Sequence, residues 1–197
     1  MFKRDIEEEL VKWSTDYDRK PLLLRGARQV GKTTVVRAFG KSFQQYIELN
    51  LENERDSEMF GSRDIETIVQ TIFLSNNKNL AFKENTLLFI DEIQQVPEAV
   101  NMLRYFYEKY PEIKVIAAGS LLETIFNEEK SIPVGRVDYR VMRPVSFPEF
   151  LGALGEEQAQ EQLKNIPLND FAHTTLIRLF HTYAVTGGMP EIVNRYA

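Results

Sequence analysis

The sequence predicts an α/β fold with helices on both faces of a mostly parallel β-sheet. Short apolar runs at 22–24, 87–90 and 115–118 are typical of strands buried on both faces, which occur in parallel sheets. Stretches with helical periodicity separate these runs, as the crossovers between parallel strands require. A glycine-bearing loop also joins the first run directly to a helix.

The elements of the first 142 residues follow from this periodicity. An amphipathic helix is predicted over 5–17, where apolar residues recur at spacings of three and four, namely Ile6, Leu10, Trp13 and Tyr17. After it we expect strands at 22–24, 45–51, 87–90, 115–118 and 139–142, with helices at 32–41, 64–75 and 97–110.

The C-terminal part has helical signals only. Ser146 and Glu149 form a capping box that begins a helix. Residues 152–167 are polar and are expected to be a mobile hinge or an exposed helix. Asp170 is predicted to cap a helix that runs to about Thr186 and buries Leu176, Ile177, Phe180 and Tyr183. Gly187 and Gly188 end that helix, and Pro190 begins another.

Composition narrows the function classes. The chain of 197 residues has 24 Lys and Arg against 29 Asp and Glu, so nucleic-acid binding is not indicated, although a local basic patch would allow it. The lack of cysteine excludes disulfides, thiol nucleophiles and Cys-ligated metals. No apolar run reaches the ~18 residues of a membrane helix, and the N-terminus becomes acidic where a signal peptide would be apolar. We therefore expect a cytoplasmic protein without a membrane partner.

The strongest motif is a phosphate loop at residues 26–33, Gly-Ala-Arg-Gln-Val-Gly-Lys-Thr. Its glycines let consecutive backbone N–H groups converge on anionic oxygens, and the dipole of the following helix favours them further. Lys32 is expected to reach the β- and γ-phosphates, and the Thr33 hydroxyl to ligate Mg²⁺. A chance match in a turn is the alternative, but a buried strand precedes this motif and a helix follows it. The predicted nucleotide-binding residues are Gly26, Ala27, Arg28, Gln29, Val30, Gly31, Lys32, Thr33 and Thr34, with the Arg28 side chain structural or facing solvent.

Two carboxylates follow the strand at 87–90. Ligands of open α/β sheets bind at the carboxyl ends of strands, so Asp91 and Glu92 should face the phosphate loop. Asp91 is expected to bind Mg²⁺, directly or through water, and Glu92 to activate the attacking water as general base. The alternative is a strand that simply ends in solvent. A GTPase would need an Asn-Lys-x-Asp motif, and 77–80 lacks the aspartate, so ATP is the expected nucleotide.

Two further residues are candidates for catalysis. Ser120 ends the strand at 115–118 and could contact the γ-phosphate or the attacking water, or else cap the next helix. Arg136 precedes the last strand and could act as an arginine finger, or else be an ordinary surface arginine.

With these motifs, the chain resembles AAA+-type ATPases of the additional-strand P-loop class. More narrowly, it resembles a bacterial and archaeal group of AAA-domain proteins that usually carry a further C-terminal domain of unknown function. The resemblance covers nearly the whole chain and depends on the segments at 24–34, 46–50, 89–94, 118–120, 135–137, 143–150 and 187–190.

The resemblance implies an ATPase core at 1–150 with a five-stranded sheet, and the start of a helical lid at 151–197. It implies that Pro190, in Gly-Gly-Met-Pro, contacts adenine, and that the region from Arg4 to Ile6 helps form the base pocket. It also implies a longer protein that continues into an effector domain.

Together these motifs predict Mg²⁺-dependent ATP hydrolysis to ADP and phosphate, with lid movement that couples the nucleotide state to a partner, an effector domain or an oligomer. A low-turnover ATP-gated switch or scaffold uses the same pocket and remains an alternative. A motor stimulated by nucleic acid is a third hypothesis, against which the acidic net charge of −5 argues.

Overall fold

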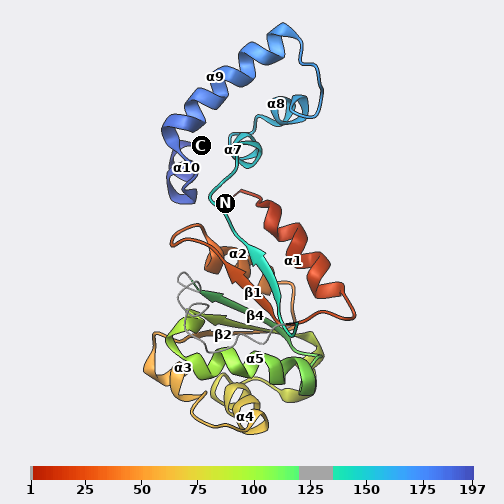
Figure 1. The fold of residues 1–197 in the computed structure, drawn as a ribbon, viewed down its shortest axis with the longest axis vertical. Helices are drawn as coiled ribbons and strands as arrows, with labels where there is room; N and C mark the ends of the chain where they lie inside the picture. The colour runs from red at the N-terminus through yellow and green to blue at the C-terminus, as the bar shows by residue number, and fades with distance from the viewer. Residues whose placement is uncertain (1, 120–134) are drawn as a thin grey trace. The chain divides into compact units, whose positions relative to one another are not determined.

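The computed structural model describes residues 2–119 and 135–197, which pack into two compact units (Figure 1). The sheet unit comprises Leu10–Gly26 and Lys32–Met142. The helical unit comprises the N-terminal residues up to Glu9, the segment Ala27–Gly31, and Arg143–Ala197. The division at Arg143 precedes the predicted boundary at 150, and the helical unit also takes in part of the phosphate loop.

The sheet unit is built on a five-stranded parallel sheet in the order β2-β3-β4-β1-β5. This confirms the predicted α/β fold. Every residue of β3 is buried, as its continuous apolar run predicts for a strand inside a parallel sheet. The strands are β1 (Leu22–Arg25), β2 (Gln45–Asn50), β3 (Thr86–Asp91), β4 (Lys114–Gly119) and β5 (Asp138–Val141).

Helices cover the sheet on both faces. Figure 1 shows α4 (Ile65–Ser75) and α5 (Pro97–Lys109) on one side of the sheet and α2 (Lys32–Gly40) on the other. The apolar faces of α4 and α5 pack on the strands in one large core that includes Ile68 and Leu103. The other elements are α1 (Asp5–Thr15), α3 (Glu54–Glu58) and the 3₁₀ turns η1 (Leu80–Asn85) and η2 (Ile93–Gln95). No periodic pattern in the sequence predicts α3 or the two 3₁₀ turns, because these elements are too short to show one.

The helical unit contains α7 (Phe147–Ala153), α8 (Glu157–Gln162), α9 (Asp170–Thr186) and α10 (Pro190–Tyr196). The predicted capping box begins α7: Ser146 Oγ accepts from the Glu149 N–H, and the Glu149 carboxylate accepts from the Ser146 N–H. The polar stretch 152–167 includes the short helix α8. The side chain of Asn169 caps α9 by accepting the Ala172 N–H at 2.8 Å, so the prediction that Asp170 is the cap was wrong by one residue.

Three apolar side chains that were expected on buried helix faces are exposed, namely Ile177, Phe180 and Tyr17. On α9, Leu176 is buried, but Ile177 and Phe180 are 42% and 47% exposed. Leu176 packs with Leu151 and Ala159 of the neighbouring helices, and this contact covers only a narrow side of α9. Tyr17 is exposed because α1 ends at Thr15, before the periodic pattern does.

Within the described residues, 2–119 and 135–197, no helix is long and apolar enough to cross a membrane.

Candidate functional site

The phosphate-loop segment follows β1 and has an unusual backbone. Gln29 and Gly31 have φ values of 64° and 95°, and Gly26 has a φ of 153°. Glycine adopts these angles readily, whereas Gln29 is in a left-handed conformation that costs most side chains free energy. Such alternation of backbone conformation makes consecutive N–H groups converge on one point, which is the geometry of an anion-binding nest.

Lys32 begins α2 directly after this loop. The residue is 6% exposed, and its Nζ donates a 2.8 Å hydrogen bond to the Gly26 carbonyl oxygen. An ammonium group is a compact charge with three donors on a flexible stem. The phosphate-loop motif uses such a charge to contact bound phosphates.

Thr33 and Asp91 meet at the carboxyl edge of the sheet. The Thr33 hydroxyl donates a 2.7 Å hydrogen bond to Asp91 Oδ2, and Asp91 is 8% exposed. Burial raises the pKa of Asp91 above its ordinary value, although hydrogen bonds from Thr33 and from the Glu92 N–H oppose the rise. A bound cation would offset the unfavourable burial of this carboxylate. A hydroxyl beside a carboxylate is also an oxygen donor set that suits Mg²⁺, so these residues fit the metal that the fold family implies.

Glu92 follows Asp91 at the end of β3 and has a left-handed backbone, with a φ of 51°. Its carboxylate accepts a hydrogen bond from the amide of Gln94 in η2. This role of Gln94 was not predicted, although the residue lies in the segment 89–94 that carries the family resemblance. The sequence feature that could have indicated this contact is the position of the Gln94 amide, two residues after the predicted general base Glu92.

The structure does not bring Arg136 to Lys32 and Asp91. Arg136 precedes β5, whose first residue Asp138 pairs with the first residue of β1, Leu22. It therefore lies at the amino edge of the sheet, where it forms an ion pair with Glu108 of α5. The second candidate, Ser120, lies outside the residues that the structure describes.

Pro190 begins α10 in the helical unit, after a close backbone contact. The Val145 N–H donates a 2.7 Å hydrogen bond to the Gly188 carbonyl oxygen. A Cβ on Gly188 would lie 2.6 Å from the Val145 carbonyl oxygen, so this position needs glycine. The backbone contact gives the Gly-Gly-Met-Pro segment a defined place in the unit, and the role of Pro190 at adenine stays a prediction.

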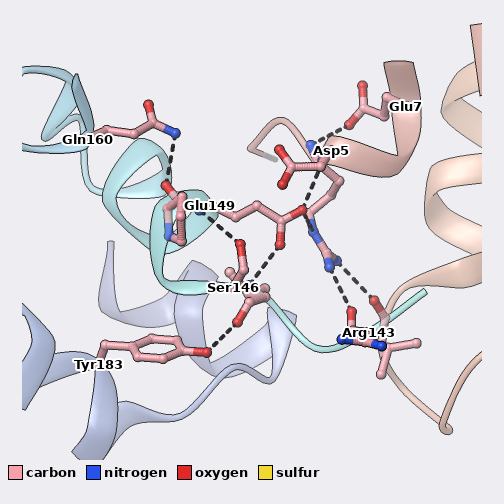
Figure 2. Close-up of polar contacts among 11 residues, drawn as sticks. Asp5, Glu7, Arg143, Ser146, Glu149, Gln160 and Tyr183 are labelled. Atoms are coloured by element: carbon pink, nitrogen blue, oxygen red, sulfur yellow. Dashed lines mark hydrogen bonds and ion pairs between the residues drawn. The ribbon is translucent and has the colours of Figure 1, made fainter. Parts of the chain in front are cut away.

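A buried ion pair in the helical unit was not predicted. Glu149 Oε1 accepts from Arg4 Nε at 3.0 Å and from the Asp5 N–H at 2.9 Å. Figure 2 shows the Glu149 carboxylate between Ser146 and Asp5, with the contacts drawn as dashed lines. Burial raises the pKa of Glu149, but hydrogen bonds from the Ser146 N–H, from Arg4 and from the Asp5 N–H outweigh it, and the pKa falls below its ordinary value. Arg4 and Glu149 are 145 residues apart, so no local pattern could reveal the pair.

Comparisons with known proteins bear on the family of the chain. The family model described as "AAA domain" matches residues 18–151. The replication factor C large subunit of Methanosphaera stadtmanae is 34% identical over 95 residues, which is 48% of this chain and 16% of that protein. The chain thus spans a small part of the length of this relative.

The fold is shared with one solved structure. A chain of Drosophila ORC, from a structure of ORC bound to DNA, aligns with a TM-score of 0.55 and 16% identity, over 94% of this chain and 57% of that one. A chain of C. elegans PCH-2 aligns with a TM-score of 0.49 and 16% identity, over 86% of this chain and 50% of that one. Since the family model covers well over half of the sequence, the chain belongs to the AAA-domain family, a family of P-loop ATPases.

Proposed function

We propose that this chain binds ATP with Mg²⁺ and hydrolyses it to ADP and phosphate. The observation that carries the proposal is the 2.7 Å hydrogen bond from Thr33 to the buried Asp91, next to Glu92. It gathers the predicted metal-binding hydroxyl, a carboxylate and the predicted base at one edge of the sheet.

Each residue has a distinct task in this proposal. The backbone N–H groups of residues 26–34 and the Lys32 ammonium bind the phosphates and orient the γ-phosphate for attack. Thr33 and Asp91 bind the metal, Thr33 through its hydroxyl. When bound, Mg²⁺ would neutralise charge on the β- and γ-phosphate oxygens. Glu92 accepts a proton from the attacking water and orients its oxygen towards phosphorus.

The test is phosphate release from ATP under single-turnover conditions, with Mg²⁺ or with a chelator. We expect release with Mg²⁺ and ATP, far slower release with chelator, and preference for ATP over GTP. The same assay on Lys32→Ala protein excludes a contaminating ATPase. If the folded wild-type protein binds no ATP, the proposal is wrong.

A low-turnover switch is the second candidate, and the contact between Gln94 and Glu92 favours it. A base whose carboxylate is bound by a neighbouring amide is less available to water. Gln94→Ala should then release phosphate faster than the wild type. Equal or slower release in Gln94→Ala would remove the support for this candidate.

We also propose that the nucleotide state moves the helical unit. This movement would couple ATP hydrolysis to a protein partner, an effector domain or another copy of the chain. One relative is named a replication factor, and one structural neighbour is ORC bound to DNA. DNA is therefore the first ligand to add to the phosphate-release assay. Stimulation that fades with rising salt would support a nucleic-acid partner.

A further inference from the structure

Buried charges outside the proposed site are few. Among the described residues, 2–119 and 135–197, the buried charged residues are Lys32, Asp91, Arg4 and Glu149. The first two belong to the proposed ATP site. Burying the second two is unfavourable unless each is fully hydrogen-bonded, so their partners indicate what the pair is for.

The guanidinium of Arg4 uses its donors on three different segments. Nε binds the Glu149 carboxylate at 3.0 Å, Nη2 donates to the Arg143 carbonyl oxygen at 2.9 Å, and Nη1 donates to the Val30 carbonyl oxygen at 3.1 Å. Val30 is the residue before Gly31 in the phosphate loop. The network around Glu149 and Arg143 in Figure 2 thus continues, through Arg4, to the backbone of that loop.

We propose that Arg4 is a positioning residue for the phosphate loop, an inference that rests on the proposed ATP binding. The carbonyl and the N–H of one trans peptide point in opposite directions because the peptide is planar. Fixing the Val30 carbonyl oxygen on Arg4 therefore aims the Gly31 N–H the other way. That N–H is one of the donors expected to bind phosphate.

The loop needs such support because its backbone is costly to maintain. The peptide between Val30 and Gly31 lies between two positive φ angles, 64° at Gln29 and 95° at Gly31. Because glycine tolerates a wide range of φ, this peptide could rotate about the ψ of Val30 and the φ of Gly31, which would turn the Gly31 N–H away from the phosphates. Glu149 acts on the loop indirectly, because its carboxylate orients the Arg4 guanidinium through Nε.

The test compares ADP binding by titration calorimetry, with melting temperature and circular dichroism as measures of folding. The main variant is the double substitution Arg4→Met with Glu149→Gln. It removes both charges at similar volume, so no unpaired charge is left buried. We expect a folded protein that binds ADP at least tenfold more weakly than the wild type. Glu149→Gln alone keeps an acceptor for Arg4 Nε and should lose less than threefold.

Arg19→Met is the matched control. Arg19 also donates to backbone carbonyl oxygens, those of Asp16, Pro111 and Glu112, and none of them lies in the phosphate loop. This variant should melt earlier but bind ADP as the wild type does. A loss that came from general destabilisation would appear in Arg19→Met as well.

The outcomes separate the two proposals. If the wild type binds no ADP or ATP, the proposed function fails. If the wild type binds ADP and the folded double variant binds it within twofold, the role of Arg4 is refuted. If the double variant does not fold, Arg4→Lys decides by the same criterion, since lysine keeps the charge beside Glu149 but lacks the planar fork with which arginine reaches separate acceptors.

Discussion

The Thr33 hydroxyl donates a 2.7 Å hydrogen bond to the Asp91 carboxylate, across 58 residues of sequence. Thr33 lies in the first turn of the helix after β1, and Asp91 ends β3. The carboxyl ends of parallel strands share an edge, and β4 between β1 and β3 keeps the two ends at the same level. This contact joins the phosphate-loop motif to the acidic strand end.

Lys32→Ala should abolish tight ATP binding. The substitution removes the charge expected at the β- and γ-phosphates and the contact with the Gly26 carbonyl oxygen. We expect the dissociation constant for ATP to rise by at least about tenfold, in line with loss of a charged hydrogen bond. The measurement is titration calorimetry, and Lys41→Ala, at an exposed lysine after α2, is the control. Unchanged binding in Lys32→Ala would contradict the assignment.

Glu92→Gln should bind ATP but hydrolyse it slowly. The amide keeps the shape of the side chain but cannot accept a proton from water. Loss of a general base lowers the rate by about 10²–10⁴-fold. Phosphate release measures this, and Glu98→Gln on the exposed side of α5 should behave as the wild type. Equal rates in Glu92→Gln and the wild type would remove Glu92 as the base.

Asp91→Asn should stabilise the protein at neutral pH in the absence of nucleotide and metal. Burial raises the pKa of Asp91 in the folded state, so ionisation disfavours folding above the ordinary value of 3.8. Asparagine avoids this penalty, and its advantage should vanish below about pH 3.8, where both states are protonated. Thermal melting at several pH values measures the difference. Mg²⁺-dependent hydrolysis should be lost in the same variant.

Asp64→Asn is the control, and its effect on stability at neutral pH should have the opposite sign. Asp64 caps α4 by accepting from the N–H and the hydroxyl of Thr67, and these bonds lower its pKa. Its ionised form therefore stabilises the fold above pH 3.8, and this stability is lost as the pH falls through the lowered pKa. A destabilising Asp91→Asn substitution at neutral pH would show that the Asp91 carboxylate is not penalised by burial.

Gly188→Ala should destabilise the helical unit. Its new Cβ would lie 2.6 Å from the Val145 carbonyl oxygen and 3.1 Å from Pro144 Cβ, so backbone must shift. Overpacking of this kind costs about 1–3 kcal/mol. Chemical denaturation measures the loss. Gly152→Ala within α7 is the matched control, because its Cβ would meet only Gln160, at 3.7 Å or more. Similar stability in both variants would contradict the close contact.

Several features could be predicted because short segments encode them. The spacing of glycines and Lys32 defines the phosphate loop, the apolar run before Asp91 defines a buried strand, and Ser146 with Glu149 defines a helix start. Each pattern spans few residues, and its physical cause acts over the same few residues: backbone freedom, burial on both faces, or capping of free N–H groups.

Tertiary structure alone decided the contacts between distant segments. The placement of Arg136 at the amino edge of the sheet depends on how β5 pairs with β1. The burial of Arg4 depends on Glu149, 145 residues away, and on a carbonyl oxygen of the phosphate loop. Such contacts form only after the chain has folded, because their energies depend on burial and on direction in space. The spacing of neighbouring residues in the sequence determines neither of these.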